Sequence, residues 1–84
     1  MATATIPKPT AGQLAQASKK SRQIVATWLK ENRIKADLTQ ESLATLAGID
    51  RKTINRIENG HFSPSVDTMT RVAFVLGKKI PQFI

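Results

Sequence analysis

The chain is 84 residues long and contains no cysteine, which limits it to one small domain without disulfides or thiolate metal sites. Its 13 Lys and Arg residues outnumber six Asp and Glu, giving a net charge of +7 and an isoelectric point near 10.4. Such an excess is typical of proteins that bind polyanions, although it does not separate DNA from RNA or from an acidic membrane surface.

Hydropathy gives no sign of a membrane or secreted protein. The longest apolar run, Val72 to Leu76, is far shorter than the ~20 residues of a membrane span. The first ten residues lack the apolar stretch of a secretory signal. We therefore expect a soluble protein of the cytoplasm.

The N-terminal residues 1–21 are expected to form a flexible arm, with helix as an alternative for part of it, ahead of a single domain over residues 22–84. Residues 1–12 are rich in Ala, Thr, Pro and Gly and have no amphipathic period. For residues 13–20 two alternatives stay open: a short separate helix, or an extension of the helix that follows.

The domain itself is predicted to be a compact all-α bundle of about five helices. Val25, Trp28 and Leu29 form an apolar stripe at helical spacing within residues 22–35. Trp28 is expected in the core or in a dimer contact rather than stacked on a base. The other helices are expected over residues 40–47, 51–59 and 66–76, with a last helical turn in residues 80–84.

Caps and glycines delimit these helices. Thr39, Asp50 and Ser65 stand at expected N-caps, and Gly48, Gly60 and Gly77 follow expected helix ends. The residues expected to face inward from the two central helices and their turn are Leu43, Leu46, Ile49, Ile54 and Ile57. The fourth helix is expected to contribute Val66, Met69, Val72, Ala73 and Leu76, and the tail Ile80 and Phe83.

Two short helices joined by Gly48-Ile49-Asp50 have the spacing of a helix-turn-helix. Because the apolar residues hold these helices together at a steep angle, the outer face of the second helix is free to enter a DNA groove about 12 Å wide. Arg and Lys favour guanine O6 and N7, and Asn can pair with adenine. The residues expected to contact bases on this face are Arg51, Lys52, Asn55 and Arg56.

The stretch from Leu38 to Gly60, LTQESLATLAGIDRKTINRIENG, resembles the helix-turn-helix of the lambda-repressor-like family, also called the Cro/C1 or XRE type. The likeness includes the Leu-Thr-Gln start, the Gly-Ile-Asp turn, the Ile-x-x-Ile-Glu-Asn-Gly end and the Pro-Ser start of the next helix. It extends over residues 22–83. The resemblance implies a five-helix bundle that binds double-stranded DNA as a homodimer, with its third helix in the major groove.

The resemblance also implies roles for residues outside the base-reading set. Backbone phosphate contacts, which set register without reading sequence, are implied for Gln40, Thr53, Asn59 and His61, with a base edge as an alternative for Thr53. Arg33 and Glu58 stand where the family commonly has a structural ion pair. Since Arg51 and Lys52 are adjacent, the division between base reading and phosphate binding stays open at these two positions.

The expected function is that of a sequence-specific transcriptional regulator, a repressor of phage or bacterial type at a palindromic operator, associated with the nucleoid. One alternative is a protein-interaction module of the same fold, such as an antitoxin that binds a toxin, or a coactivator. Another is charge-driven binding to nucleic acid or to an anionic membrane. The N-terminal arm either reaches a minor groove through its cations or is disordered.

No enzyme activity, cofactor or metal site is expected. His61 is the only histidine and has no cysteine or carboxylate at ligand spacing, so it is interpreted as a surface turn residue. Ser63 and Ser65 have no His or Asp partner in the sequence and are assigned to turn and cap roles. The dimer surface is expected in the C-terminal tail, with Phe83 and Ile84, and in the fourth or fifth helix.

Overall fold

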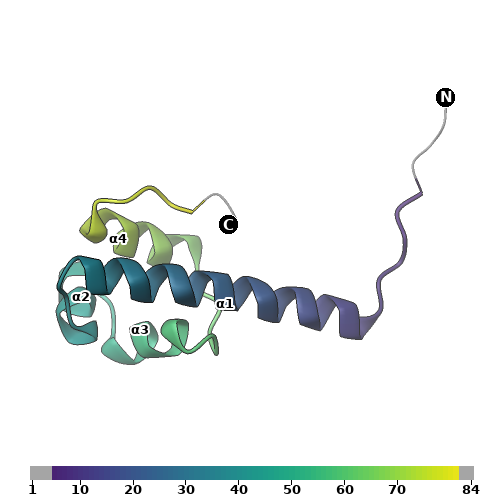
Figure 1. Cartoon of the computed structure of the whole chain (residues 1–84), viewed down its shortest axis with the longest axis horizontal. Coiled ribbons are helices and arrows are strands. Elements are labelled where there is room, and N and C mark those ends of the chain that lie inside the picture. Colours follow the sequence, from purple (N-terminus) through teal and green to yellow (C-terminus); the bar gives the residue numbers. More distant parts are fainter. Residues whose placement is uncertain (1–4, 82–84) are drawn as a thin grey trace.

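The computed structural model describes residues 5–81, and within that range it contains four α-helices and no strand. They are α1 (Ala11–Lys35), α2 (Gln40–Ala47), α3 (Arg51–Glu58) and α4 (Val66–Leu76) (Figure 1). The predicted all-α class is confirmed, with four helices in place of about five. Of the expected last turn, Ile80 and Pro81 are not helical. Phe83 and Ile84 lie outside the described residues.

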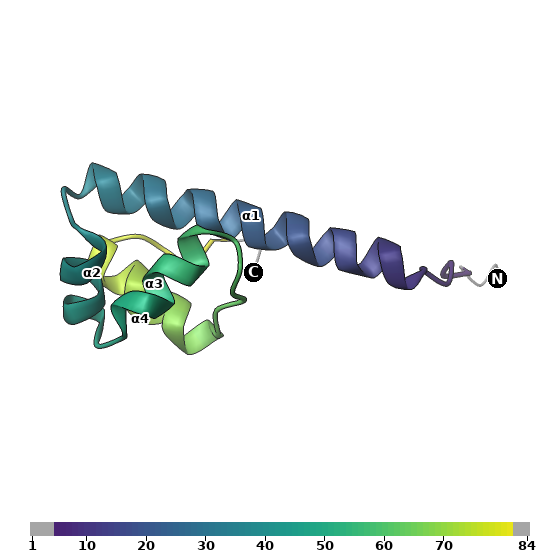
Figure 2. The same cartoon turned by 90° about the horizontal axis from the view of Figure 1, so that it is seen from below.

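Helix α1 is one continuous helix of 25 residues, so the boundary expected between residues 21 and 22 falls inside it. It begins at a capping box: the Thr10 hydroxyl accepts a bond from the Gln13 amide at 3.1 Å, and the Gln13 side chain accepts one from the Thr10 amide at 2.9 Å. Most of the segment expected as an arm is therefore helix. Figures 1 and 2 both show the N-terminal half of α1 projecting beyond the other three helices.

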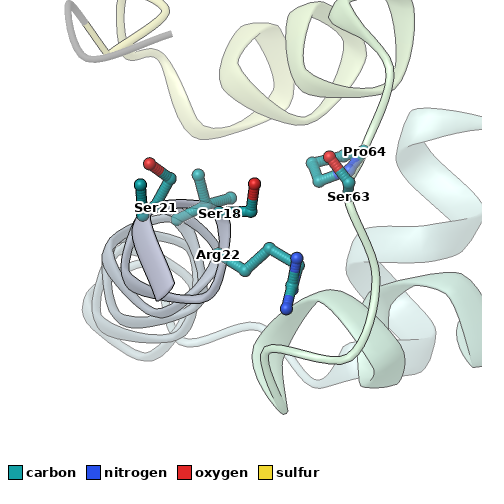
Figure 3. A pocket seen from close by; sticks show the side chains of 7 residues that line it. Ser18, Ser21, Arg22, Ser63 and Pro64 are labelled. Atoms are coloured by element: carbon teal, nitrogen blue, oxygen red, sulfur yellow. The ribbon is translucent and has the colours of Figure 1, made fainter. Parts of the chain in front are cut away.

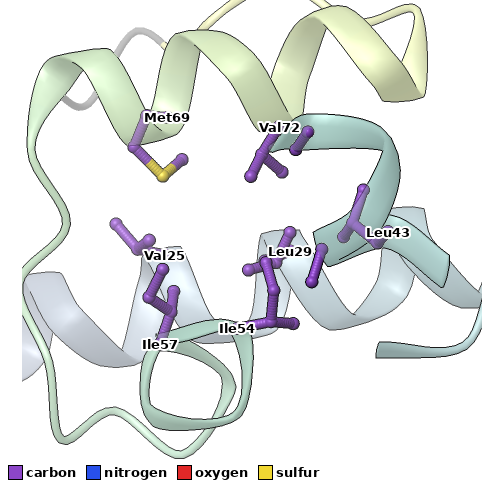
Figure 4. Packing of buried hydrophobic residues seen from close by; sticks show 9 residues of the cluster. Val25, Leu29, Leu43, Ile54, Ile57, Met69 and Val72 are labelled. Carbon is purple, nitrogen blue, oxygen red and sulfur yellow. The ribbon is translucent and has the colours of Figure 1, made fainter. Parts of the chain in front are cut away.

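The core lies where all four helices meet, and Figure 4 shows side chains from each pointing toward one another. α1 packs against α3, while α2 packs against both α3 and α4. Trp28 and Ile49 pack partly buried against this cluster. The completely buried side chains of the cluster are Leu29, Leu43, Ile54, Ile57, Met69 and Val72.

Three residues expected in the core are on the surface. Leu46 is 63% exposed, Val66 is 61% exposed and Ile80 is 38% exposed, so these predictions were wrong. Ile80 lies in the segment after α4, which is not helical. In α2 the inward stripe consists of Leu43, Ala44 and Ala47, which turns Leu46 away from the bundle. Val66 is the first residue of α4, one turn ahead of the buried Met69.

The helix ends follow the expected chemistry at all but one site. Thr39 caps α2 by accepting from the Ser42 amide at 3.0 Å, and Ser65 caps α4 through the Thr68 amide at 3.1 Å. Gly48 ends α2 in the left-handed conformation, with φ of +68°. Asp50 occupies the N-cap position of α3, but its side chain makes no cap hydrogen bond. The amino end of α3 is thus left open.

Candidate nucleic-acid interface

Helix α3 presents a cationic outer face. Only Ile54 and Ile57 of this helix are buried, and they anchor it to the core. The expected base-contacting side chains share the exposed side of the helix: Arg51, Lys52, Asn55 and Arg56. Figure 2 shows that α3 lies at the outside of the bundle beside α1, so no other helix covers this face.

Three of these cations are not engaged by the protein. Across residues 5–81, no ion pair and no side-chain hydrogen bond involves Arg51, Lys52 or Arg56. An Arg or Lys without an internal partner keeps all its donors for a ligand. The amino end and outer face of α3 can therefore donate several hydrogen bonds and attract a polyanion.

The Arg33–Glu58 ion pair holds the opposite end of α3. Arg33 Nε lies 2.7 Å from Glu58 Oε2, and Arg33 Nη2 donates to Glu58 Oε1 at 3.0 Å. The two side chains are only 13% and 3% exposed. Arg33 Nη1 also donates to the Leu38 carbonyl at 2.8 Å, which ties the α1–α2 turn to the same group. A bidentate pair of this kind fixes the direction of α3 relative to α1.

The hydrogen bonds that Arg33 donates to Glu58 raise the pKa of Arg33, an effect that partial burial opposes. Because the raised pKa belongs to a base, the contribution of the charged form to stability is present below its ordinary value. It is lost only as the pH rises through the raised value, which is strongly alkaline. Arg33 therefore remains charged at neutral pH, and this end of the ion pair is not a physiological pH switch.

A chain of amide side chains extends from Glu58 along α3. Gln40 donates from Nε2 to Glu58 Oε1 at 3.2 Å, and its Oε1 accepts from Asn55 Nδ2 at 3.3 Å. Asn55 Oδ1 in turn accepts from Asn59 Nδ2 at 3.1 Å. The side chains expected to meet phosphate at Gln40 and Asn59, and a base at Asn55, are thus joined to one another in the free protein.

The remaining predicted phosphate contacts lie at different depths. Thr53 is half-buried on α3, whereas His61 is exposed in the loop after it. The His61 amide donates to the Arg56 carbonyl at 3.0 Å, which keeps the start of this loop close to the end of α3. The structure thus brings Asn59 and His61 together beside α3 and sets Thr53 deeper.

Sequence reasoning missed one contact that shapes this loop. Arg22 Nε on α1 donates to the Gly60 carbonyl at 3.2 Å, across 38 residues of sequence. The same Arg22 lines an open hollow of about 570 Å³ between α1 and the α3–α4 loop, together with Ser18, Ser21 and Ser63 (Figure 3). No periodicity marks such a contact, because it depends on the length of α1.

Residues 5–81 carry neither a metal site nor a membrane-spanning helix. This part of the chain has no group of three or more His, Cys, Asp or Glu side chains able to hold a metal ion. None of the four helices is both long and apolar enough to cross a membrane.

Two short helices joined by a tight glycine turn, with an uncovered cationic face on the second, define a helix-turn-helix protein. A helix-turn-helix family model matches residues 29–83, about two thirds of the chain. The chain belongs to this helix-turn-helix family, of the lambda-repressor-like Cro/C1 type.

Several relatives carry a functional name. An uncharacterized HTH-type transcriptional regulator of Methanothermobacter thermautotrophicus is 42% identical over 53 residues, which are 63% of this chain and 77% of the relative. One from Archaeoglobus fulgidus is 41% identical over 54 residues, 64% of this chain and 76% of the relative. The HTH-type regulator YqaF of Bacillus subtilis is 42% identical over 50 residues, 60% of this chain and 66% of the relative. No solved structure matches the chain significantly.

Proposed function

We propose that the chain is a sequence-specific transcriptional regulator that binds double-stranded DNA through α3. The observation that carries this proposal is the set of three exposed cations on α3, Arg51, Lys52 and Arg56, which no side chain among residues 5–81 neutralises. The net charge of +7 supports a polyanionic partner, and the family and the names of its relatives support DNA as that partner.

The major groove is the proposed site for α3. A groove about 12 Å wide admits a helix, and its guanine edges offer O6 and N7 to Arg and Lys. Arg51 and Arg56 are assigned to bases, with Lys52 shared between a base and a phosphate. Asn55 reads adenine in this scheme only if its bonds to Gln40 and Asn59 rearrange, because both are made by the side-chain amide.

The phosphate backbone is proposed to bind on both sides of α3. Asn59 and His61 reach it from the end of α3 and the loop that follows, Gln40 from the start of α2, and Thr53 from α3 itself. Gln40 is held by Glu58, so it would meet phosphate with its orientation already fixed by the ion pair. These contacts set the register of α3 and carry no sequence information themselves.

The regulator is proposed to act as a homodimer on a palindromic operator, as a repressor of phage or bacterial type in the cytoplasm, without a catalytic role or a cofactor. The two-fold symmetry of a homodimer matches that of a palindromic operator, whose half-sites lie about 34–36 Å apart. We assign Arg33 and Glu58 to the architecture of the interface, because their charges satisfy one another.

The test is a selection of bound sequences from random double-stranded DNA, followed by titration of the selected sequence and of its scrambled version. The proposal predicts a palindromic sequence bound at least ~10³-fold more tightly than its scrambled version. Equal affinity for both, falling steeply with salt, would reduce the function to charge-driven association.

A protein-interaction module, such as an antitoxin or a coactivator, is the second candidate. It is favoured by an exposed apolar patch on α2 and α4, where Leu46 is 63% and Phe74 is 85% exposed. A folded chain that binds no DNA, selected or random, would point to this function instead. An antitoxin that also represses its own genes would pass both tests, and adding the partner protein would then separate the two roles.

A further inference from the structure

The N-terminal half of α1 has no partner within the bundle. Residues 11–21 are all exposed, and they lie ahead of the family match, which begins at Leu29. Isolated helices of fewer than about 12–15 residues are marginal in water even when they are rich in alanine. This half also contains Gly12, which disfavours helix. This half needs no separate nucleation, because it extends a helix that Val25 and Leu29 anchor, but its apolar side chains stay exposed among residues 5–81.

This projecting helix carries an apolar seam. Its members recur at alternating intervals of three and four residues, the spacing of helices that pack along one another: Leu14, Ala17, Ser21, Ile24 and Trp28. Leu14 is 56% exposed and Ile24 is 44% exposed, although both are large and apolar. The residues that face the bundle are different ones, namely Arg22, Val25 and Leu29.

An open hollow borders one end of the seam. Ala17 and Ser21 line the 570 Å³ hollow beside the α3–α4 loop that Figure 3 shows. Ile24 and Trp28 lie instead on an open surface formed by α1 alone, next to Lys20 and Glu31. The seam is therefore accessible along its length, and a second helix can pack on it.

We propose that the seam is a dimer interface, in which α1 of a second copy packs antiparallel and Ser21 meets Ser21 of the partner subunit. In this register Leu14 lies against Trp28 of the partner subunit, and Ala17 lies against Ile24 of the partner subunit. Ala17 thus faces a larger residue, the two Ser21 side chains allow close approach at the axis, and the contact is the same from both sides, as two-fold symmetry requires. This inference deepens the proposed function and rests on its two-fold operator.

Charge favours the antiparallel direction. Glu31 is the only acidic residue in α1, and the first turn of the helix contains none. In the antiparallel register Glu31 lies beside Ala11 of the partner subunit, at the positive end of that helix, where a carboxylate is stabilising. A parallel pair would instead bring two copies of Glu31 together, since Glu31 continues the seam three residues beyond Trp28.

The contact is small. From Leu14 to Trp28 the seam measures about 21 Å at a rise of 1.5 Å per residue. An interface of one helix pair belongs to the weak class that buries less than about 1,200 Å². We therefore expect reversible self-association without DNA, strengthened when two copies bind adjacent half-sites.

Cysteine cross-linking tests the register. The chain has no cysteine, so Ser21→Cys introduces a single thiol at the proposed two-fold axis. The matched control is Gln16→Cys, also exposed on α1 but outside the seam. With oxidised glutathione and no DNA, Ser21→Cys should form the disulfide-linked dimer at least about tenfold faster, because only that pair meets within bonding distance. Equal rates for the two variants overturn the proposal.

Sedimentation equilibrium tests the interface without chemistry. The wild-type chain should approach twice its mass of 9.2 kDa with rising concentration, whereas Leu14→Glu should remain monomeric. Gln16→Glu, which changes the charge equally outside the seam, should behave as the wild type. Circular dichroism checks that all variants stay helical. Dimers that survive Leu14→Glu but dissociate with Phe74→Glu would move the interface to the α2–α4 patch and overturn the proposal.

Titration with the selected DNA separates this inference from the proposed function. If Ser21→Cys cross-links as expected while no variant binds DNA specifically, the interface stands and the function fails. If specific DNA binding is intact but Ser21→Cys does not cross-link, the proposed function stands and the interface fails. A loss of DNA affinity in Leu14→Glu with no change in mass would place this part of α1 on DNA and overturn the dimer interface.

Discussion

Helices α2 and α3 have the same length, eight residues each, and follow one another in the chain, yet the protein holds them in different ways. α2 is capped by Thr39 at its amino end and closed by a left-handed glycine at the other. α3 has no side-chain cap bond at its amino end and is held by two isoleucines and by Glu58 near its carboxyl end.

The difference shows how an element can be positioned while its contact surface stays free. α2 contributes three buried residues and serves as a support. In α3 the attachment is confined to one side and one end, so Arg51 and Lys52 at the open end are not used for folding. In α3, therefore, the substitutions that change stability should differ from those that change function. In α2 this separation should be weaker.

The largest effect is expected from truncating the buried residues of either helix. Leu43→Ala in α2 and Ile54→Ala in α3 should each lower the free energy of unfolding by about 2–5 kcal/mol, because each side chain is completely buried and leaves a cavity. Urea denaturation measures the change. Leu46→Ala is the control and should change stability by less than about 0.5 kcal/mol. A large loss at Leu46 would contradict the division between core and surface in α2.

The next effect concerns the attachment of α3 to α1. Arg33→Met removes the charge that satisfies Glu58 and should cost about 3 kcal/mol, at the lower end of values for buried pairs because Arg33 is partly exposed. Thermal or urea unfolding at neutral pH provides the measurement. The double variant with Glu58→Met should recover part of the loss, since no unpaired carboxylate then remains. If the double variant recovered no stability, the loss in Arg33→Met would not come from an unpaired Glu58 carboxylate.

The smallest expected effect distinguishes the amino end of α2, which has a side-chain cap, from the amino end of α3, which has none. Thr39→Ala should cost about 1 kcal/mol because it removes a cap hydrogen bond, whereas Asp50→Ala should cost only a few tenths. Asp50→Ala also removes a negative charge next to Arg51, so DNA binding should become tighter rather than weaker. Equal losses of stability in the two variants would mean that α3 is capped as α2 is.

Sequence patterns predicted most of the bundle because its helices are short, amphipathic and delimited by caps and glycines. For residues 13–20 they left two alternatives open, a separate helix or an extension of the helix that follows, and the structure has the extension. The signal that was overlooked is the capping box formed by Thr10 and Gln13. Leu46 was misassigned because its spacing from Leu43 fits a helix stripe, and tertiary packing alone decides which stripe faces inward.

The cationic residues of α3 could be read from the sequence, since Arg51, Lys52 and Arg56 need only a helix register to be placed on one face. The hydrogen bonds among Gln40, Asn55 and Asn59 could not, because they depend on how closely α2 and α3 approach. The same holds for Arg22, whose bond to the Gly60 carbonyl joins residues 38 positions apart. Such contacts follow from the packing of the bundle and have no local pattern.

The most direct test of the central claim is a charge-matched pair of double variants titrated with the selected operator. Arg51→Ala with Arg56→Ala removes two cations from the face of α3. Lys78→Ala with Lys79→Ala removes two exposed cations from the segment after α4. In Figure 1 this segment and α3 lie on opposite sides of α1.

Each base-reading arginine should contribute about 1–3 kcal/mol, so the α3 variant should lose at least tenfold in affinity and also lose preference for the operator. The control should lose little affinity and keep its preference. Equal losses in both variants, with sequence preference unchanged, would contradict the claim that α3 reads DNA.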